Sequence, residues 1–306
     1  MSVSTKVYAN LLAICSSKRL DAERLRRIVE AKTVEEAFKM LGDYGYAYTA
    51  GSSVDGFIVA ETNKLIEFIE SASPSDKLKN ALLARFKYNN AKLAYKSRFT
   101  EVPSDGYYEV DIDSHKIAEG DYSDVDKFMS AALEELDEQK ENRPQAIDLA
   151  LTRAMYALIL SCGIMPVKKY FRTEIDLKNI LSAARMKRLG ISGDEFLNGG
   201  RLPRDVLSEA VSSESFAESF EGTRYEEYAE NIEQSEFKEL WRSELDADDY
   251  LFFMTDKEVK NFSSYDPFLN YYTEALVELK TVKTALVCIK TDTRGSFYER
   301  IPKLYK

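Results

Sequence analysis

The clearest hydrophobic pattern in the chain lies in the stretch Glu174–Arg188, which reads EIDLKNILSAARMKR. Its apolar residues recur every three or four positions, the spacing that gathers side chains on one face of an α-helix. They are Leu177, Ile180, Leu181 and Ala184. Basic residues crowd its end, where they suit the negative pole of a helix dipole. A second face carries Asp176, Asn179 and Ala183, so the stretch is predicted to be a helix with polar groups at regular positions.

A related pattern occurs twice more along the chain. The upstream copy has Lys87, Asn90 and Ala94 at the same spacing, and the downstream copy has Glu278, Thr281 and Ala285. The separations are similar, since 176 − 87 = 89 and 278 − 176 = 102. The alanine is common to all three copies, and an acid followed by Leu-Lys is common to the last two. Two explanations remain open here, namely three related helical units or a chance likeness between amphipathic helices.

The rest of the chain also has helical patterning, and no strand signal stands out. Helices are predicted near Thr5–Ser17, Asp55–Ser71, Val125–Lys140 and Gln145–Ile164, and from Asp266-Pro267 onward. Asp21, Thr33 with Glu36, and Ser73 or Ser75 are suited to cap helix starts because their side chains accept from free backbone N–H groups. The acidic, turn-rich segment 101–124 is predicted to be a linker. We therefore predict an all-α protein of three helical units, 1–103, 104–189 and 190–306.

Composition narrows the class of protein. With 44% hydrophobic and 31% charged residues the chain is globular, and its net charge of −10 argues against binding nucleic acid or anionic lipid. The most apolar run, Ala154–Met165, is shorter than the roughly 20 residues that cross a bilayer, so no direct lipid insertion is expected. The three cysteines are far apart and belong to no motif, which predicts reduced, buried thiols.

Motifs for catalysis or cofactor binding are missing from the sequence. No phosphate-binding glycine loop, nucleophile elbow or zinc-ligand spacing occurs. The one histidine, His115, lies in the acidic linker near Asp111 and Asp113, and we interpret it as a surface residue of a loop. A binding or mechanical protein without cofactor or metal is therefore favoured over an enzyme.

Two stretches carry a family resemblance. Glu174–Arg185, preceded by Tyr170-Phe171, resembles the signature of the C-type rotor protein of prokaryotic V/A-type rotary ATPases, the counterpart of the d-type protein in eukaryotic vacuolar ATPases. Asp266–Lys290 resembles the closing helix of that family, and Tyr8–Leu20 resembles its opening helix more loosely. Lys87 stands where the family pattern expects an acid. The resemblance extends over the whole chain.

The resemblance implies a non-catalytic rotor subunit on the cytoplasmic face of a membrane complex. Its three bundles would form a funnel with pseudo-threefold symmetry that joins the central shaft subunits to the proteolipid ring and transmits torque for H⁺ or Na⁺ transport. The candidate positions for shaft or ring contacts, or for the repeat signature alone, are Asn90, Ala94, Asp176, Asn179, Ala183, Arg185, Glu278, Lys280 and Ala285.

Alternatives remain for both the residues and the function. The polar signature residues could line the funnel, or they could be buried groups that hold the bundles together. The chain could instead be a generic helical interaction scaffold, which would need an exposed apolar groove. An α-helical hydrolase or metal enzyme would need carboxylates converging on His115.

Overall fold

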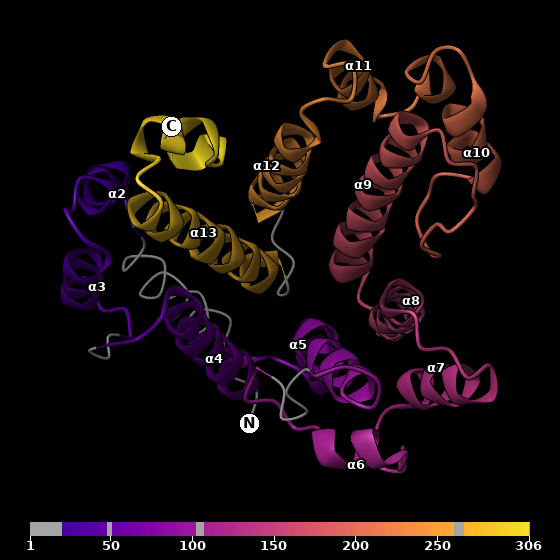
Figure 1. Cartoon of the computed structure of the whole chain (residues 1–306), viewed down its shortest axis with the longest axis horizontal. Coiled ribbons are helices and arrows are strands. Elements are labelled where there is room, and N and C mark those ends of the chain that lie inside the picture. The colour runs from indigo at the N-terminus through magenta and orange to yellow at the C-terminus, as the bar shows by residue number, and fades with distance from the viewer. Residues whose placement is uncertain (1–19, 48–50, 102–106, 260–265, 306) are drawn as a thin grey trace. The chain divides into compact units, whose positions relative to one another are not determined.

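The protein is all-α in the part of the chain that the computed structural model describes, residues 20–47, 51–101, 107–259 and 266–305 (Figure 1). The predicted first helix, Thr5–Ser17, and Cys15 lie outside these ranges. The described α-helices are α2 (Ala22–Val29), α3 (Val34–Asp43), α4 (Val54–Ala72), α5 (Asp76–Lys96), α6 (Ser114–Glu119), α7 (Lys127–Glu138), α8 (Pro144–Ser161), α9 (Met165–Leu189), α10 (Arg204–Ser212), α11 (Glu226–Gln234), α12 (Leu240–Val259) and α13 (Asp266–Lys290). Short 3₁₀ helices cover η1 (Glu218–Phe220), η2 (Arg294–Glu299) and η3 (Lys303–Tyr305).

The helix starts follow the predicted caps. Asp21, Thr33 and Ser75 each accept a hydrogen bond from a backbone N–H in the first turn of the helix that follows. Glu36 completes the cap of α3 by accepting from the backbone N–H of Lys32. Pro144 occupies the first turn of α8, where its missing N–H costs nothing. The predicted helices around 55–71, 125–140 and 145–164 therefore correspond to α4, α7 and α8.

The chain divides into two compact units. The terminal unit comprises the described residues up to 68 and from 241 onward, and the middle unit comprises residues 69–240. This division does not test the predicted three units 1–103, 104–189 and 190–306, which stay a prediction. The two buried cysteines among the described residues, Cys162 and Cys288, are free thiols, as expected.

A hydrophobic core of the terminal unit is built around α13. Helices α2 and α3 pack against α13, and Phe38 stacks on Phe57 with 4.9 Å between ring centroids. Side chains from both ends of the chain enter this core, among them Leu25, Ile28, Val282, Leu286, Phe297, Ile301 and Tyr305. Sequence-distant segments thus share one close-packed interior, which makes the unit stiff.

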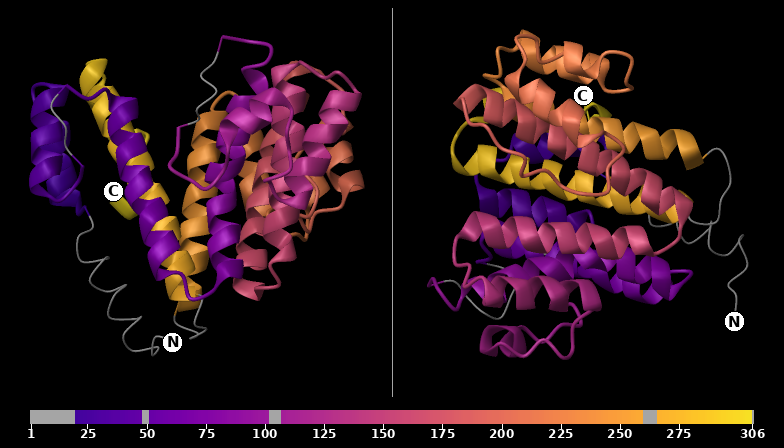
Figure 2. Two further views of the ribbon diagram at one scale, coloured as in Figure 1. Left: turned by 90° about the horizontal axis from the view of Figure 1, so that it is seen from below. Right: turned by 90° about the vertical axis from the view of Figure 1, so that its right-hand side faces the viewer.

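The middle unit is organised by three long helices, α5, α8 and α9 (Figure 2). Lys92 on α5 donates to Thr152 on α8 (2.7 Å), and Lys96, one turn later, pairs with Asp148, one turn earlier (2.6 Å). These contacts make α5 and α8 antiparallel. Since a short turn reverses the chain between α8 and α9, α5 and α9 run in the same direction.

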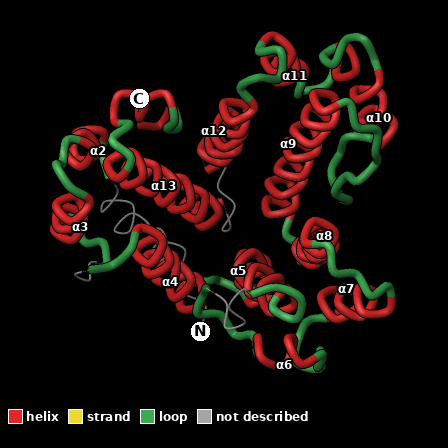
Figure 3. The backbone as a smooth tube through the Cα atoms, viewed as in Figure 1, coloured by secondary structure: helices red, strands yellow, loops and turns green. Residues whose placement is uncertain are grey.

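One part of the predicted linker 101–124 is helical. Residues 114–119 form α6, which Asp113 begins by accepting from the backbone N–H groups of His115 and Lys116. The prediction of a loop at His115 was therefore wrong, although the side chain is exposed as expected. The glycine-rich segment between α9 and α10 remains a loop (Figure 3). Helix α6 could not be predicted because its six residues are too few to show a helical repeat of apolar positions.

Candidate functional site

Asn90, one of the predicted signature residues, anchors the segment that follows its own helix. It lies on α5 with 2% of its surface exposed. Its Nδ2 donates to the carbonyl of Tyr108 (2.7 Å), and its Oδ1 accepts from the backbone N–H groups of Tyr107 (3.0 Å) and Tyr108 (3.2 Å). One side-chain amide therefore pairs with both the C=O and the N–H groups of the backbone that follows α5.

Asn179 makes the same arrangement on α9. Its Nδ2 donates to the carbonyl of Leu197 (3.0 Å), and its Oδ1 accepts from the N–H of the same residue (2.8 Å). Both asparagines bind a residue 18 positions further along the chain. Two chance amphipathic helices would not be expected to share this bond at the same offset, so the structure supports a common design for α5 and α9.

Asp176 anchors a second part of the loop after α9. Its Oδ1 accepts from the backbone N–H groups of Arg201 (2.7 Å) and Leu202 (3.0 Å), while its Oδ2 accepts from the hydroxyl of Tyr225 (2.7 Å). The carboxylate is fully buried. Three hydrogen bonds to a charged acceptor compensate its removal from water.

The same connection exists on α5 with donor and acceptor exchanged. Position 87 is a lysine, but the next residue, Tyr88, donates from its hydroxyl to Asp126 Oδ1 (3.0 Å). Asp126 is the N-cap of α7, and Tyr225 is the N-cap of α11. In both cases an acid–tyrosine pair joins the long helix to the start of the second helix after it. Lys87, where the family pattern expects an acid, is thus followed by a tyrosine that is bonded to an acid on α7.

Glu278 has the corresponding place on α13, in the terminal unit. Its carboxylate accepts from the backbone N–H of Leu20 (3.0 Å) and from the hydroxyls of Tyr46 (2.5 Å) and Tyr305 (3.4 Å). Burial, followed by the nearby Glu278 carboxylate, raises the pKa of Tyr46, so this phenol stays a donor. Glu278 thus ties together segments from both ends of the described chain.

The remaining predicted positions fall into two groups. The shared alanines, Ala94, Ala183 and Ala285, are completely buried, as close helix packing requires. Arg185 and Lys280 are exposed, and Lys280 pairs with Asp248. The structure brings Asp176, Asn179 and Ala183 together on the buried face of α9 and leaves Arg185 outside it. Buried, bonded geometry favours the packing role for the polar signature residues, and exposed Arg185 and Lys280 remain the candidates for partner contact.

Replacing Asn179 by alanine should lower the free energy of unfolding by about 2 kcal/mol, because the part-buried N–H and C=O of Leu197 lose their partner. Asn90→Ala should have a similar cost. Asn80→Ala, an exposed asparagine on α5, is the control and should change stability little. Urea unfolding of the three variants would measure this. Equal stability of Asn179→Ala and the unmodified chain would contradict an anchoring role.

A charged cluster that the sequence did not reveal lies where α5, α8 and α9 meet. Arg85 Nη2 binds Glu174 Oε1 at 2.7 Å, and Lys178 Nζ is 3.6 Å from the same oxygen. Burial raises the pKa of Glu174, but the charges of Arg85 and Lys178 outweigh it and hold the pKa below its usual value. Arg85 and Glu174 are 89 residues apart, like Asn90 and Asn179. Two residues with the same separation as the two asparagines thus touch one another, a contact that no local pattern could have signalled.

Lys92 on α5, whose charge is repelled by Lys178 of this cluster, gives a prediction for pH dependence. Burial, together with Lys178 and Lys96, lowers its pKa from 10.5 to about 8 despite the opposing charge of Asp148. Between these two values the unfolded chain binds more protons than the folded chain, so the contribution of Lys92 to stability rises with pH. Lys92→Met should therefore stabilise the protein near neutral pH and remove this rise. Urea unfolding at several pH values tests it, with exposed Lys77→Met as the control.

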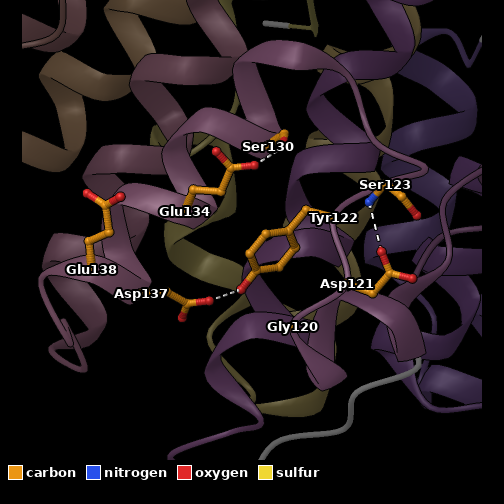
Figure 4. Close-up of a pocket in the computed structure, with 8 residues that line it drawn as sticks. All are labelled: Gly120, Asp121, Tyr122, Ser123, Ser130, Glu134, Asp137 and Glu138. Carbon is orange, nitrogen blue, oxygen red and sulfur yellow. Dashed lines mark hydrogen bonds between the residues drawn. The ribbon is translucent and has the colours of Figure 1, made fainter.

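An acidic pocket lies beside α7 (Figure 4). The carboxylate of Asp137, which lines it, already has hydrogen-bond donors within the protein. Asp137 accepts from Tyr95 (2.9 Å), Arg98 (2.7 Å) and Tyr122 (2.6 Å). Burial raises the pKa of Asp137, but these hydrogen bonds outweigh it and lower the pKa, so the group stays ionised. Among the described residues, no three His, Cys, Asp or Glu side chains are placed to hold a metal ion. The pocket is therefore a junction between α5, α7 and the loop that precedes α7.

These features define an all-helical protein whose long helices hold their following loops through buried amides and carboxylates. Comparison with known families gives the particular assignment. Residues 11–296 match the model of the ATP synthase (C/AC39) subunit family, and the chain belongs to that family. It is thus a subunit of a V/A-type rotary ATPase, and the resemblance found at Glu174–Arg185 and Asp266–Lys290 is confirmed. A comparison with curated proteins finds no match. None of the described helices combines the length and apolar character of a membrane span.

Proposed function

We propose that the chain is the non-catalytic central-stalk subunit that joins the rotary shaft to the proteolipid ring and transmits torque on the cytoplasmic face of the membrane. The observation that carries the proposal is the match to the ATP synthase (C/AC39) subunit family over residues 11–296. A shaft and a ring of unequal diameter need an adapter between them. The three bundles predicted from the sequence would give such an adapter a pseudo-threefold funnel.

The anchoring bonds support a mechanical role. An element that carries torque must not let its loops move against its helices, because deformation would absorb the work. Asn90, Asn179, Asp176 and Glu278 each fix a connecting segment to a long helix by two or more hydrogen bonds. Charged acceptors make several of these bonds strong ones.

The order of long and short helices along the chain also supports a repeated helical unit. After α5, with 21 residues, come α6, α7 and the long α8, and after α9, with 25 residues, come α10, α11 and the long α12. Each set thus has a long helix, two shorter ones and a second long helix. Asn90 on the first long helix of one set and Asn179 on the first long helix of the other each bind a residue 18 positions further along the chain.

The proposal is tested by removing the chain from cells that contain the ATPase. Vesicles from such cells should lose ATP-driven ion uptake, while ATP hydrolysis by the detached catalytic head persists. Expression of the unmodified chain should restore uptake. Unchanged ion uptake per ATP hydrolysed in the absence of the chain would contradict the proposal.

Partner contact can be separated from packing by comparing two variants. Folded Asn179→Ala should bind the shaft as well as the unmodified chain does, whereas Arg185→Glu, which alters an exposed residue, should still fold and should weaken binding to one rotor partner. Weaker shaft binding by fully folded Asn179→Ala would instead assign that residue to the interface.

A further inference from the structure

Three charged side chains, one from each of the helices α5, α8 and α9, act on the amino group of Lys92. They are Lys96 on α5, Asp148 on α8 and Lys178 on α9. The acid among them is already paired, because Asp148 Oδ1 accepts from Lys96 Nζ at 2.6 Å. Lys92 on α5 is therefore a cation that lies close to two other cations and to an acid that is already engaged.

Lys178 is only partly compensated by its own acid. Its Nζ lies 3.6 Å from Glu174 Oε1, but Arg85 Nη2 holds the same oxygen more closely, at 2.7 Å. The Lys178 ammonium also lies 5.7 Å from the centre of the Tyr156 ring. One carboxylate thus serves two cations, which leaves positive charge in excess on the side of Lys92 that faces α9.

The amino group of Lys92 is positioned by Thr152 and can be reached from water. Its Nζ donates to Thr152 Oγ1 (2.7 Å). The Thr152 hydroxyl donates in turn to the backbone carbonyl of Asp148 (2.6 Å), so toward Lys92 it acts as an acceptor. This bond uses a single N–H of the amine. Since Lys92 is partly exposed, a small molecule in solution has access to Nζ.

The same surroundings leave this amine less protonated than an ordinary lysine. Burial lowers the pKa of Lys92 to about 8, opposed by Asp148 and helped by Lys178 and Lys96. At about pH 8 half of the Lys92 amines are then neutral, compared with roughly one in 300 for a lysine with the usual pKa of 10.5. A neutral amine is a nucleophile, and the neighbouring cations would stabilise a product with negative charge.

We propose that Lys92 is a reversible carbamylation site, at which carbon dioxide adds to Nζ. The amine lone pair forms the new N–C bond, one C–O π pair moves onto oxygen, and a proton leaves the nitrogen for water. The product, –NH–COO⁻, keeps one N–H for Thr152 and places an anion beside Lys96 and Lys178. The inference goes beyond the rotor role and does not depend on it, since it concerns one side chain of the chain itself.

The test incubates the full chain with isotopically labelled bicarbonate, in equilibrium with carbon dioxide, near the pKa of Lys92. Triethyloxonium ion converts any carbamate to a stable ethyl ester, and peptide mass spectrometry locates it. Lys92 should be labelled at least about tenfold more than Lys77, an exposed lysine of the same helix. Lys178→Met should lower trapping at Lys92 by about tenfold because a stabilising charge is lost. Lys77→Met is the matched control and should leave trapping at Lys92 unchanged.

Thermal unfolding in sealed cells gives a second readout. At equal pH and ionic strength, bicarbonate in place of chloride should raise the unfolding temperature of the unmodified chain and of Lys77→Met but not of Lys92→Met, because a group bound only by the folded chain stabilises it. Circular dichroism confirms that the variants fold. The proposal is overturned if Lys92 yields no ester or is labelled no more than Lys77. Stabilisation by bicarbonate without an ester at Lys92 would show a bound anion only and would also overturn it.

Discussion

Asp176→Ala is expected to be the most destabilising single substitution among the signature residues, with a loss of about 4 kcal/mol in the free energy of unfolding. The variant removes the acceptor for the N–H groups of Arg201 and Leu202 and for the hydroxyl of Tyr225. All three donors would then lose their acceptor, and the Asp176 side chain that they surround is fully buried. Urea unfolding measures the loss.

A matched comparison separates anchoring from a simple change of charge. Glu230→Ala removes an exposed acid from α11 and should change stability by less than about 0.5 kcal/mol. Asp176→Asn keeps the shape and part of the acceptor capacity, so it should fall between the two. If Asp176→Ala were as stable as Glu230→Ala, the carboxylate would not be holding the loop.

Gly200→Ala should lower the free energy of unfolding by about 3 kcal/mol because the site has no room for a methyl group. A Cβ atom at position 200 would lie 2.2 Å from Asp176 Oδ1 and 3.1 Å from Ile175 Cγ2. The carboxylate cannot turn away without giving up its own donors. The neighbouring Gly199 is needed for a second reason, since its φ of +96° belongs to the left-handed region.

The two substitutions should not be additive. In the Asp176→Ala background the obstructing oxygen is gone, so Gly200→Ala should cost much less than it does in the unmodified chain. Calorimetric or urea unfolding of the single and double variants gives this coupling energy. Additive losses would show that the glycine is required for a reason other than the approach of the carboxylate.

The sequence was sufficient to predict most of the long described helices, α4, α5, α7, α8, α9 and α13, because caps and hydrophobic periodicity are local signals. Asp21, Thr33 and Ser75 sit where their helices begin, and the family was recognisable from residues on α9 and α13. The short helix α6 was missed because it has fewer than two turns. Its cap, Asp113, was part of an acidic run that predicted a linker equally well.

The partners of the signature residues could not be predicted in the same way. A buried asparagine has the same sequence pattern whether it faces a funnel or the backbone of Leu197. The pairing of Asp176 with Tyr225 spans 49 residues, and that of Glu278 with Leu20 spans 258. Such contacts arise from tertiary packing, which one amphipathic helix does not encode. The offset of 18 residues shared by Asn90 and Asn179 became meaningful only once both bonds were seen.

The most direct test of the rotor assignment joins the chain covalently to its proposed neighbours. Two fusions are made in the assembled ATPase through flexible linkers of equal length, one to a proteolipid of the ring and one to a stator protein. ATP-driven ion transport is then measured in membrane vesicles. If the chain turns with the ring, the ring fusion should keep transport and the stator fusion should stop it. Transport that is stopped by the ring fusion but survives the stator fusion would contradict the assignment.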